Sequence, residues 1–243
     1  MTTGNVVAIN GNMVSVSVKG DVSMNEVGYI KVEDKRLKAE VIRVRADQAE
    51  LQVFEDTKGV SVGDEVEFTA ELLAVELGPG LLSTVCDGLQ NPLPELAEQA
   101  GVFLQRGLYL KALDRSRKWT FTPSVAEGDT LAAGDEVGSV PEGIFRHRIM
   151  VPFGWRGSFT VTSIKAEGDY TIDETVAEVT DEDGNTRSIT MVFEWPVKRA
   201  IDAYAERQRP EEPMVTKVRI IDTFLPVARG GTYCIPGPFG AGK

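Results

Sequence analysis

The sequence predicts a mainly β protein with a small N-terminal β-barrel, a second β-rich module inserted after it, and the beginning of an α/β domain. Three observations predict this class. Apolar and polar residues alternate from Asn5 to Thr69, and a second β-rich block with many tight turns runs from about Asp114 to Arg187. The last residues are a short apolar segment followed by a glycine-rich loop, and a strand followed by such a loop is typical of an α/β nucleotide-binding domain.

Residues 1–70 are expected to form the barrel. Val14, Val16 and Val18 alternate with polar residues after the turn pair Asn10-Gly11, which predicts an opening hairpin. Similar stretches follow at Tyr29 to Val32, Leu37 to Val44, Ala49 to Phe54, and at Val66 and Phe68 after the turn Gly63-Asp64. Six short strands within these residues predict a closed barrel, because closure removes exposed strand edges.

Residues 71–113 are expected to form a packed linker that starts the next domain, and residues 114–190 the inserted module. The breaker Gly78-Pro79-Gly80 and a short helix from Pro94 to Ala100 mark the linker. The module is marked by turns at Glu127-Gly128-Asp129, Gly134-Asp135, Glu167-Gly168-Asp169 and Glu182-Asp183-Gly184-Asn185. This turn spacing favours a protruding module (a bulge domain) of short strands, with a fold similar to a barrel-sandwich.

Residues 191–243 are expected to belong to the α/β domain. Val197 to Arg209 has helical composition, prolines interrupt it, and Val215 to Ile221 has the β-branched content of a strand. Gly231 to Pro236 is expected to be a further short strand that feeds the glycine-rich loop.

Composition excludes several classes of function. The chain has 26 basic and 37 acidic residues, and a net charge of -11 argues against nucleic acid or an anionic membrane as the main partner. Two cysteines and one histidine predict neither a disulfide framework nor a zinc site. Because no apolar run approaches the roughly 20 residues of a membrane-spanning helix and no signal peptide is evident, a soluble cytoplasmic protein is expected.

The chemistry-bearing motif is Gly237-Pro238-Phe239-Gly240-Ala241-Gly242-Lys243, which fits the phosphate-binding pattern G-x-x-x-x-G-K. Such a loop surrounds a triphosphate with backbone N–H groups, so small residues are needed for close approach. Pro238 lacks an N–H, which leaves the donors to the residues from Gly240 onward. All seven residues are candidate nucleotide-binding residues, and Lys243 is the candidate catalytic residue because it supplies charge to the β- and γ-phosphates. The alternative is a flexible glycine-rich tail.

Other candidate sites carry weaker chemistry. His147 lies between two arginines on an alternating stretch and is interpreted as a surface or packing residue. The acidic tract from Thr180 to Asn185 lacks the spacing of a calcium loop and is interpreted as a hairpin turn. The module has no lysine placed for covalent carrier function. No metal site is therefore assigned within the chain.

Several segments, in order along the chain, resemble the catalytic A subunit of V/A-type rotary ATPases. The run from Arg219 to Thr232, continued by Ile235 to Gly240, is very similar to the approach to that family's nucleotide site. Further matches are Glu76 to Leu82, Asp87-Gly88, Asn91-Pro92-Leu93, Arg106-Gly107, Leu113-Asp114-Arg115, Trp119 to Pro123 and Trp195-Pro196-Val197. The sequence departs from the family where Arg229 replaces a usual lysine and Ala241 a common serine.

The resemblance implies the function. It implies a subunit of a ring of three A and three B subunits around central stalk subunits, which binds Mg-ATP or ADP and couples ATP synthesis or hydrolysis to proton or sodium transport. Contact with the membrane is then indirect, through the complex. It also implies that the chain is the front portion of the subunit, cut at Lys243, so that the magnesium ligands lie beyond it and the 243-residue piece alone is inactive. The competing functions are a hexameric P-loop nucleic-acid motor and a non-catalytic scaffold.

Overall fold

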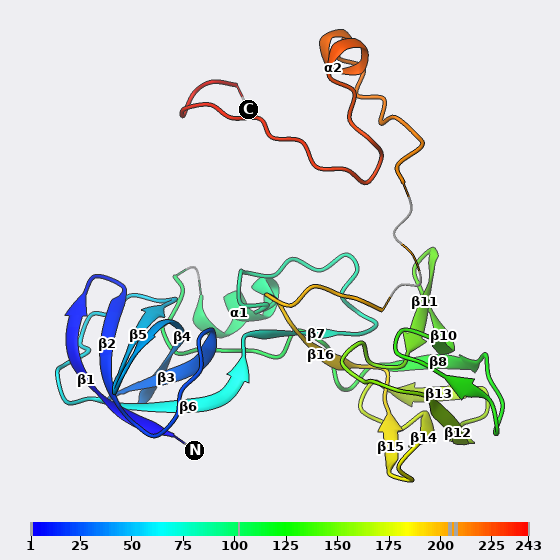
Figure 1. Ribbon diagram of the computed structural model, residues 1–243, viewed down its shortest axis with the longest axis horizontal. Coiled ribbons are helices and arrows are strands. Elements are labelled where there is room, and N and C mark those ends of the chain that lie inside the picture. The colour runs from blue at the N-terminus through cyan, green and yellow to red at the C-terminus, as the bar shows by residue number, and fades with distance from the viewer. Residues whose placement is uncertain (1, 102, 204–205, 207–208, 243) are drawn as a thin grey trace. The chain divides into compact units, whose positions relative to one another are not determined.

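A closed antiparallel barrel of six strands forms the N-terminal part of the computed structural model, which describes residues 2–101, 103–203, 206 and 209–242. The strands are β1 (Thr3–Asn10), β2 (Met13–Lys19), β3 (Glu26–Val32), β4 (Lys35–Arg45), β5 (Gln48–Val53) and β6 (Glu65–Leu72), drawn in blue to cyan in Figure 1. They follow the order β1-β2-β5-β4-β3-β6, and β6 pairs with β1 to close the barrel. The predicted barrel is confirmed.

The barrel interior explains the alternation in the sequence. Val14 and Val16 of β2 are fully buried, while Ser15 and Ser17, which alternate with them, are only half-buried. Phe68 of β6 is the largest side chain in this core, with 1% of its surface exposed. Because burial of a large apolar side chain contributes about 1.5–3 kcal/mol, a barrel filled from all six strands has its own source of stability.

The segment after the barrel packs back onto it through Tyr109. The hydroxyl of Tyr109 donates to Glu55 Oε2 at 2.6 Å and accepts the backbone N–H of Lys38 at 2.7 Å. Gly107 N–H donates to the other oxygen of Glu55 at 3.0 Å. Burial and the neighbouring Glu55 raise the pKa of Tyr109, and burial lowers the pKa of Lys38. The helix of this segment, α1 (Leu93–Ala100), has Leu96 as its buried residue.

Two four-stranded sheets form the second module, and one core lies between them. The first sheet has the order β11-β10-β8-β13 and the second β15-β14-β12-β9. Their bounds are β8 (Lys118–Pro123), β9 (Thr130–Leu131), β10 (Glu136–Glu142), β11 (Phe145–Met150), β12 (Phe159–Ile164), β13 (Gly168–Thr171), β14 (Ala177–Asp181) and β15 (Thr186–Ile189). Phe121 of the first sheet and Phe159 of the second are fully buried in this shared core. The predicted second β-rich module is confirmed.

A two-stranded ribbon joins the two ends of this module. Strand β7 (Ala74–Leu77) directly follows the barrel and pairs antiparallel with β16 (Phe193–Pro196), so that Leu77 faces Phe193. Arg115 donates to Glu76 of β7 and, at 2.8 Å, to Asp173 of the module. Everything between residues 78 and 192 is therefore an insertion between paired strands.

Three expectations for the C-terminal part are wrong. The described residues of 197–209 contain no helix, and residues 204, 205, 207 and 208 lie outside the described part. Lys198 forms an ion pair with Glu40 at 2.8 Å, and Trp195 Nε1 donates a hydrogen bond to the carbonyl of Arg199 at 2.9 Å. The expected strand at 215–221 is replaced by helix α2 (Arg219–Phe224). Residues 231–236 form no strand, because no described segment pairs with them.

Residues 204–243 form a compact unit of their own, separate from residues 1–203. Helix α2 is its one helix among the described residues, and it is drawn in orange in Figure 1. Across the described residues of both units, no helix is long and apolar enough to cross a membrane.

Gly138 provides a test of the module core. A Cβ at Gly138 would lie 2.3 Å from Cε2 of Phe121 and 2.7 Å from the carbonyl oxygen of Thr122. We expect Gly138→Ala to lower the free energy of unfolding by about 1–3 kcal/mol through overpacking. The control Gly88→Ala, where a Cβ meets nothing within 4 Å, should stay within about 0.5 kcal/mol. Urea unfolding followed by tryptophan fluorescence measures both, and equal midpoints would contradict the packing account.

Candidate functional site

The candidate phosphate loop is exposed and irregular. Residues 237–242 all lie on the surface, with a turn at 239–240. Gly240 (φ 83°) and Gly242 (φ 78°) have left-handed backbone conformations, which residues with a side chain adopt only with strain. The glycines of the pattern therefore serve the turn itself. Lys243, the candidate catalytic residue, lies outside the described residues.

The loop does not yet form a ring of donors. The N–H of Ala241 donates to the carbonyl of Pro238 at 3.3 Å, so this donor points back into the loop. Phe239 is fully exposed. An anion would have to turn the Ala241 peptide outward before it could use that N–H group.

The segment before the loop is closed by a short antiparallel bridge. Pro213 pairs with Ala228, Met214 N–H donates to the carbonyl of Val227 at 2.7 Å, and Arg229 N–H donates to the carbonyl of Glu212 at 2.9 Å. The guanidinium of Arg229 also contacts the carboxylate of Glu212 at 2.9 Å. The chain between these residues, including α2, is thus a loop with joined ends.

Asp222 explains why a helix replaces the expected strand. Its Oδ1 accepts the backbone N–H and the hydroxyl of Thr216 at 2.9 and 2.6 Å, and its Oδ2 accepts the N–H of Lys217 at 3.0 Å. These hydrogen bonds lower the pKa of Asp222, those from Thr216 most. The carboxylate of Asp222 accepts the N–H groups of Thr216 and Lys217, which in a strand would donate to a neighbouring strand. The chain therefore forms helix α2 here in spite of its β-branched residues.

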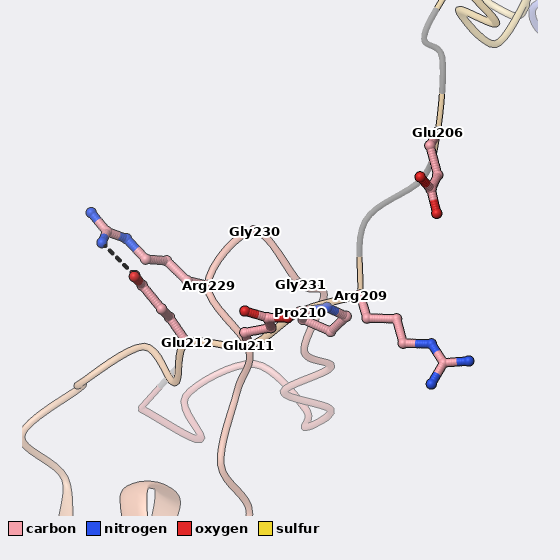
Figure 2. A pocket seen from close by; sticks show the side chains of 8 residues that line it. All are labelled: Glu206, Arg209, Pro210, Glu211, Glu212, Arg229, Gly230 and Gly231. Atoms are coloured by element: carbon pink, nitrogen blue, oxygen red, sulfur yellow. Dashed lines mark hydrogen bonds and ion pairs between the residues drawn. The ribbon is translucent and has the colours of Figure 1, made fainter.

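A hollow in this unit is lined by residues outside the phosphate loop. It measures about 1110 Å³, and Figure 2 shows its lining, which consists of Glu206, Arg209, Pro210, Glu211, Glu212, Arg229, Gly230 and Gly231. Arg229 is directed toward Glu212, whereas Arg209 points away from this pair. The two arginines do not converge on one point, so the hollow offers no paired cationic site for a phosphate.

The other sequence candidates lie apart from the loop. The acidic tract forms the turn between β14 and β15, where Asp181 accepts the N–H of Asn185 at 2.9 Å and hydrogen bonds lower the pKa of Asp181. In the described part of the chain, no group of three or more His, Cys, Asp or Glu residues could hold a metal. Cys86 is half-buried and Cys234 is exposed, and both are free.

His147 has a partner that the pattern did not reveal. Its Nδ1 lies 2.7 Å from Oε2 of Glu142, a buried carboxylate on the paired strand β10. The turn at Gly143-Ile144 sets a register in which Glu142 and His147 are diagonal neighbours on paired strands. A hairpin predicted around this turn would have indicated the contact from the sequence.

Asp222→Ala tests the helix account. The lowered pKa means that the stabilisation by the carboxylate is present above its ordinary pKa of about 3.9 and is lost as the pH falls through the lowered value. We expect the variant to speed amide exchange of Leu225, which donates to Ile221, at neutral pH. NMR-detected exchange measures this, with Arg219→Ala on the same helix as the control. Unchanged protection of Leu225 in Asp222→Ala would contradict it.

Two family models match the chain. The ATP synthase alpha/beta family β-barrel domain matches residues 6–70, and the ATP synthase alpha/beta subunit barrel-sandwich domain matches residues 110–198. These ranges coincide with the six-strand barrel and with the two-sheet module.

Curated relatives match almost the whole chain. The V-type ATP synthase alpha chain of Treponema denticola is 67% identical over 242 residues, which is 100% of this chain and 41% of that protein. The V-type ATP synthase alpha chain 1 of Treponema pallidum is 60% identical over the same shares, and the alpha chain of Borrelia hermsii is 58% identical over 99% of this chain and 42% of its own length. The chain thus spans about two fifths of the length of these relatives. It belongs to the V-type ATP synthase alpha-chain family and corresponds to the N-terminal part of such a chain, with its β-barrel and barrel-sandwich domains.

Proposed function

We propose that this chain is part of the catalytic subunit of a rotary ATP synthase or ATPase. In this subunit, residues 237–243 bind the phosphates of Mg-ATP or ADP. The observation that carries the proposal is the pattern from Gly237 to Lys243 in a chain that is 67% identical to a V-type ATP synthase alpha chain. The positive φ of Gly240 and Gly242 supports it, because such a backbone lets successive N–H groups converge on an anion.

In this proposal Lys243 has the catalytic role. Its ammonium would neutralise charge on the β- and γ-phosphates, while the N–H groups from Gly240 onward hold the oxygens. Gly237, Pro238 and Phe239 would set the entry of the loop. The bridge between Pro213 and Ala228 joins the chain upstream of residues 229–236, which lead into the loop.

The partners follow from the same proposal. The subunit would alternate with B subunits in a three-plus-three ring around central stalk subunits, peripheral to the membrane on its cytoplasmic side, and would couple the reaction to proton or sodium transport. The net charge of -11 supports protein partners over nucleic acid.

We also propose that residues 71–113 and 191–243 belong to one nucleotide-binding domain, interrupted by the module at 114–190. The pairing of β7 with β16 supports this division.

Lys243→Ala in the complete subunit tests the catalytic role. We expect ATP turnover by the reconstituted complex to fall by about 10²–10³-fold, because the lysine acts on phosphate charge, while ring assembly is retained. Lys217→Ala, which removes a lysine just before α2, is the matched control and should keep turnover near that of the wild type. Turnover of the Lys243 variant close to that of the wild type would exclude the proposed role.

The 243-residue chain alone should bind Mg-ATP poorly. The loop is exposed and the segment before it is unpaired, so binding must order it at a cost of about 1–2 kcal/mol per residue. A few charge-assisted hydrogen bonds do not offset this cost over seven residues. Calorimetric titration measures the affinity. A dissociation constant in the low micromolar range would show that the site is preformed and would overturn this expectation.

A further inference from the structure

A mostly apolar cavity of about 260 Å³ lies where the segment after the barrel meets the second module. Its apolar lining includes Leu77, Leu81, Met150, Phe153 and Phe193. Phe153 makes edge-to-face contacts with Phe193 at 5.2 Å and with Trp195 at 5.7 Å between ring centroids. These contacts hold the aromatic wall in place, so the cavity does not depend on a loose side chain.

Glu142 and His147 are two of the polar residues that line the cavity. Glu142 is only 6% exposed, and its Oε1 accepts the N–H groups of Gly80 at 2.6 Å and Leu82 at 3.2 Å. Its Oε2 lies 2.7 Å from Nδ1 of His147. The carboxylate is therefore fixed from three directions, and it fixes the imidazole in turn.

This arrangement sets the hydrogen-bonding character of the cavity. A carboxylate only accepts hydrogen bonds, so Nδ1 of His147 carries the proton. In the neutral ring the other nitrogen, Nε2, is then an acceptor, and the described residues place no donor against it. Arg148 also lines the cavity, but its guanidinium is engaged by Glu136 at 2.8 Å.

The size and the walls define the ligand class. An apolar cavity of about 150 Å³ holds benzene, so a cavity of about 260 Å³ has room for a two-ring aromatic molecule. Apolar walls disfavour a charged ligand, whereas one donor group would meet the free acceptor. We propose that this cavity binds a neutral two-ring aromatic molecule with a single hydroxyl or N–H donor, which donates to Nε2 of His147. The site involves no residue of the phosphate loop and stands apart from the nucleotide proposal.

The single histidine of the chain makes the test direct. In the ¹⁵N-imidazole NMR spectrum of the 243-residue protein, we expect the Nδ1–H form of His147. Titration with 2-naphthol should shift the Nε2 resonance to saturation. Naphthalene, which has the same rings without the hydroxyl, should bind about fivefold more weakly, as expected for the loss of one hydrogen bond.

Two variants separate the hydrogen bond from simple apolar binding. His147→Phe should reduce the affinity for 2-naphthol to that for naphthalene, followed through the methyl signal of Met150. Arg146→Phe adds the same ring on the neighbouring residue of β11, which does not line the cavity, and should keep the difference. Absence of a saturable shift, an Nε2–H form of the free imidazole, or equal affinities of the two probes for the wild type would overturn the proposal. The wild-type comparison decides even if His147→Phe fails to fold.

Discussion

The pairing of β7 with β16 is the constraint on which the organisation of residues 1–203 depends. One strand leaves the barrel and the other leaves the second module, and the register places Leu77 opposite Phe193. The module can therefore be long and have its own core, while the chain segments before and after it stay paired with each other through β7 and β16. This is the arrangement expected of an insertion into a domain whose strands stay paired.

Two carboxylates, the half-buried Glu55 and the buried Glu142, fix the segment between the barrel and the module. Glu55 accepts Tyr109 and Gly107 on the barrel side, and Glu142 accepts Gly80 and Leu82 on the module side. Each carboxylate accepts two hydrogen bonds from backbone or hydroxyl donors of the segment. The segment is long and mostly irregular, yet its polar groups are tied to a folded surface at both ends.

The barrel and the module could be predicted because their cores have a period of two along the chain. Val14, Val16 and Phe68 point inward for the same reason that their polar neighbours point outward. The β7–β16 ribbon could not be predicted, since its strands are short and far apart in sequence. Helix α2 was missed because the β-branched content suggested a strand, whereas the hydrogen bonds of Asp222 decide the local conformation. The loop pattern at 237–243 was evident from the sequence, but its conformation depends on neighbours that the pattern does not describe.

The most direct test of the central constraint compares two excised pieces of the chain. Residues 74–200 include the β7–β16 ribbon and the contacts of Trp195 with Phe153 and Arg199, and residues 78–192 lack them. Urea unfolding of both pieces measures what the ribbon contributes. We expect one cooperative transition for residues 74–200 and a clearly lower midpoint for residues 78–192. Equal midpoints, or an unfolded 74–200 piece, would contradict the claim that the ribbon closes the module.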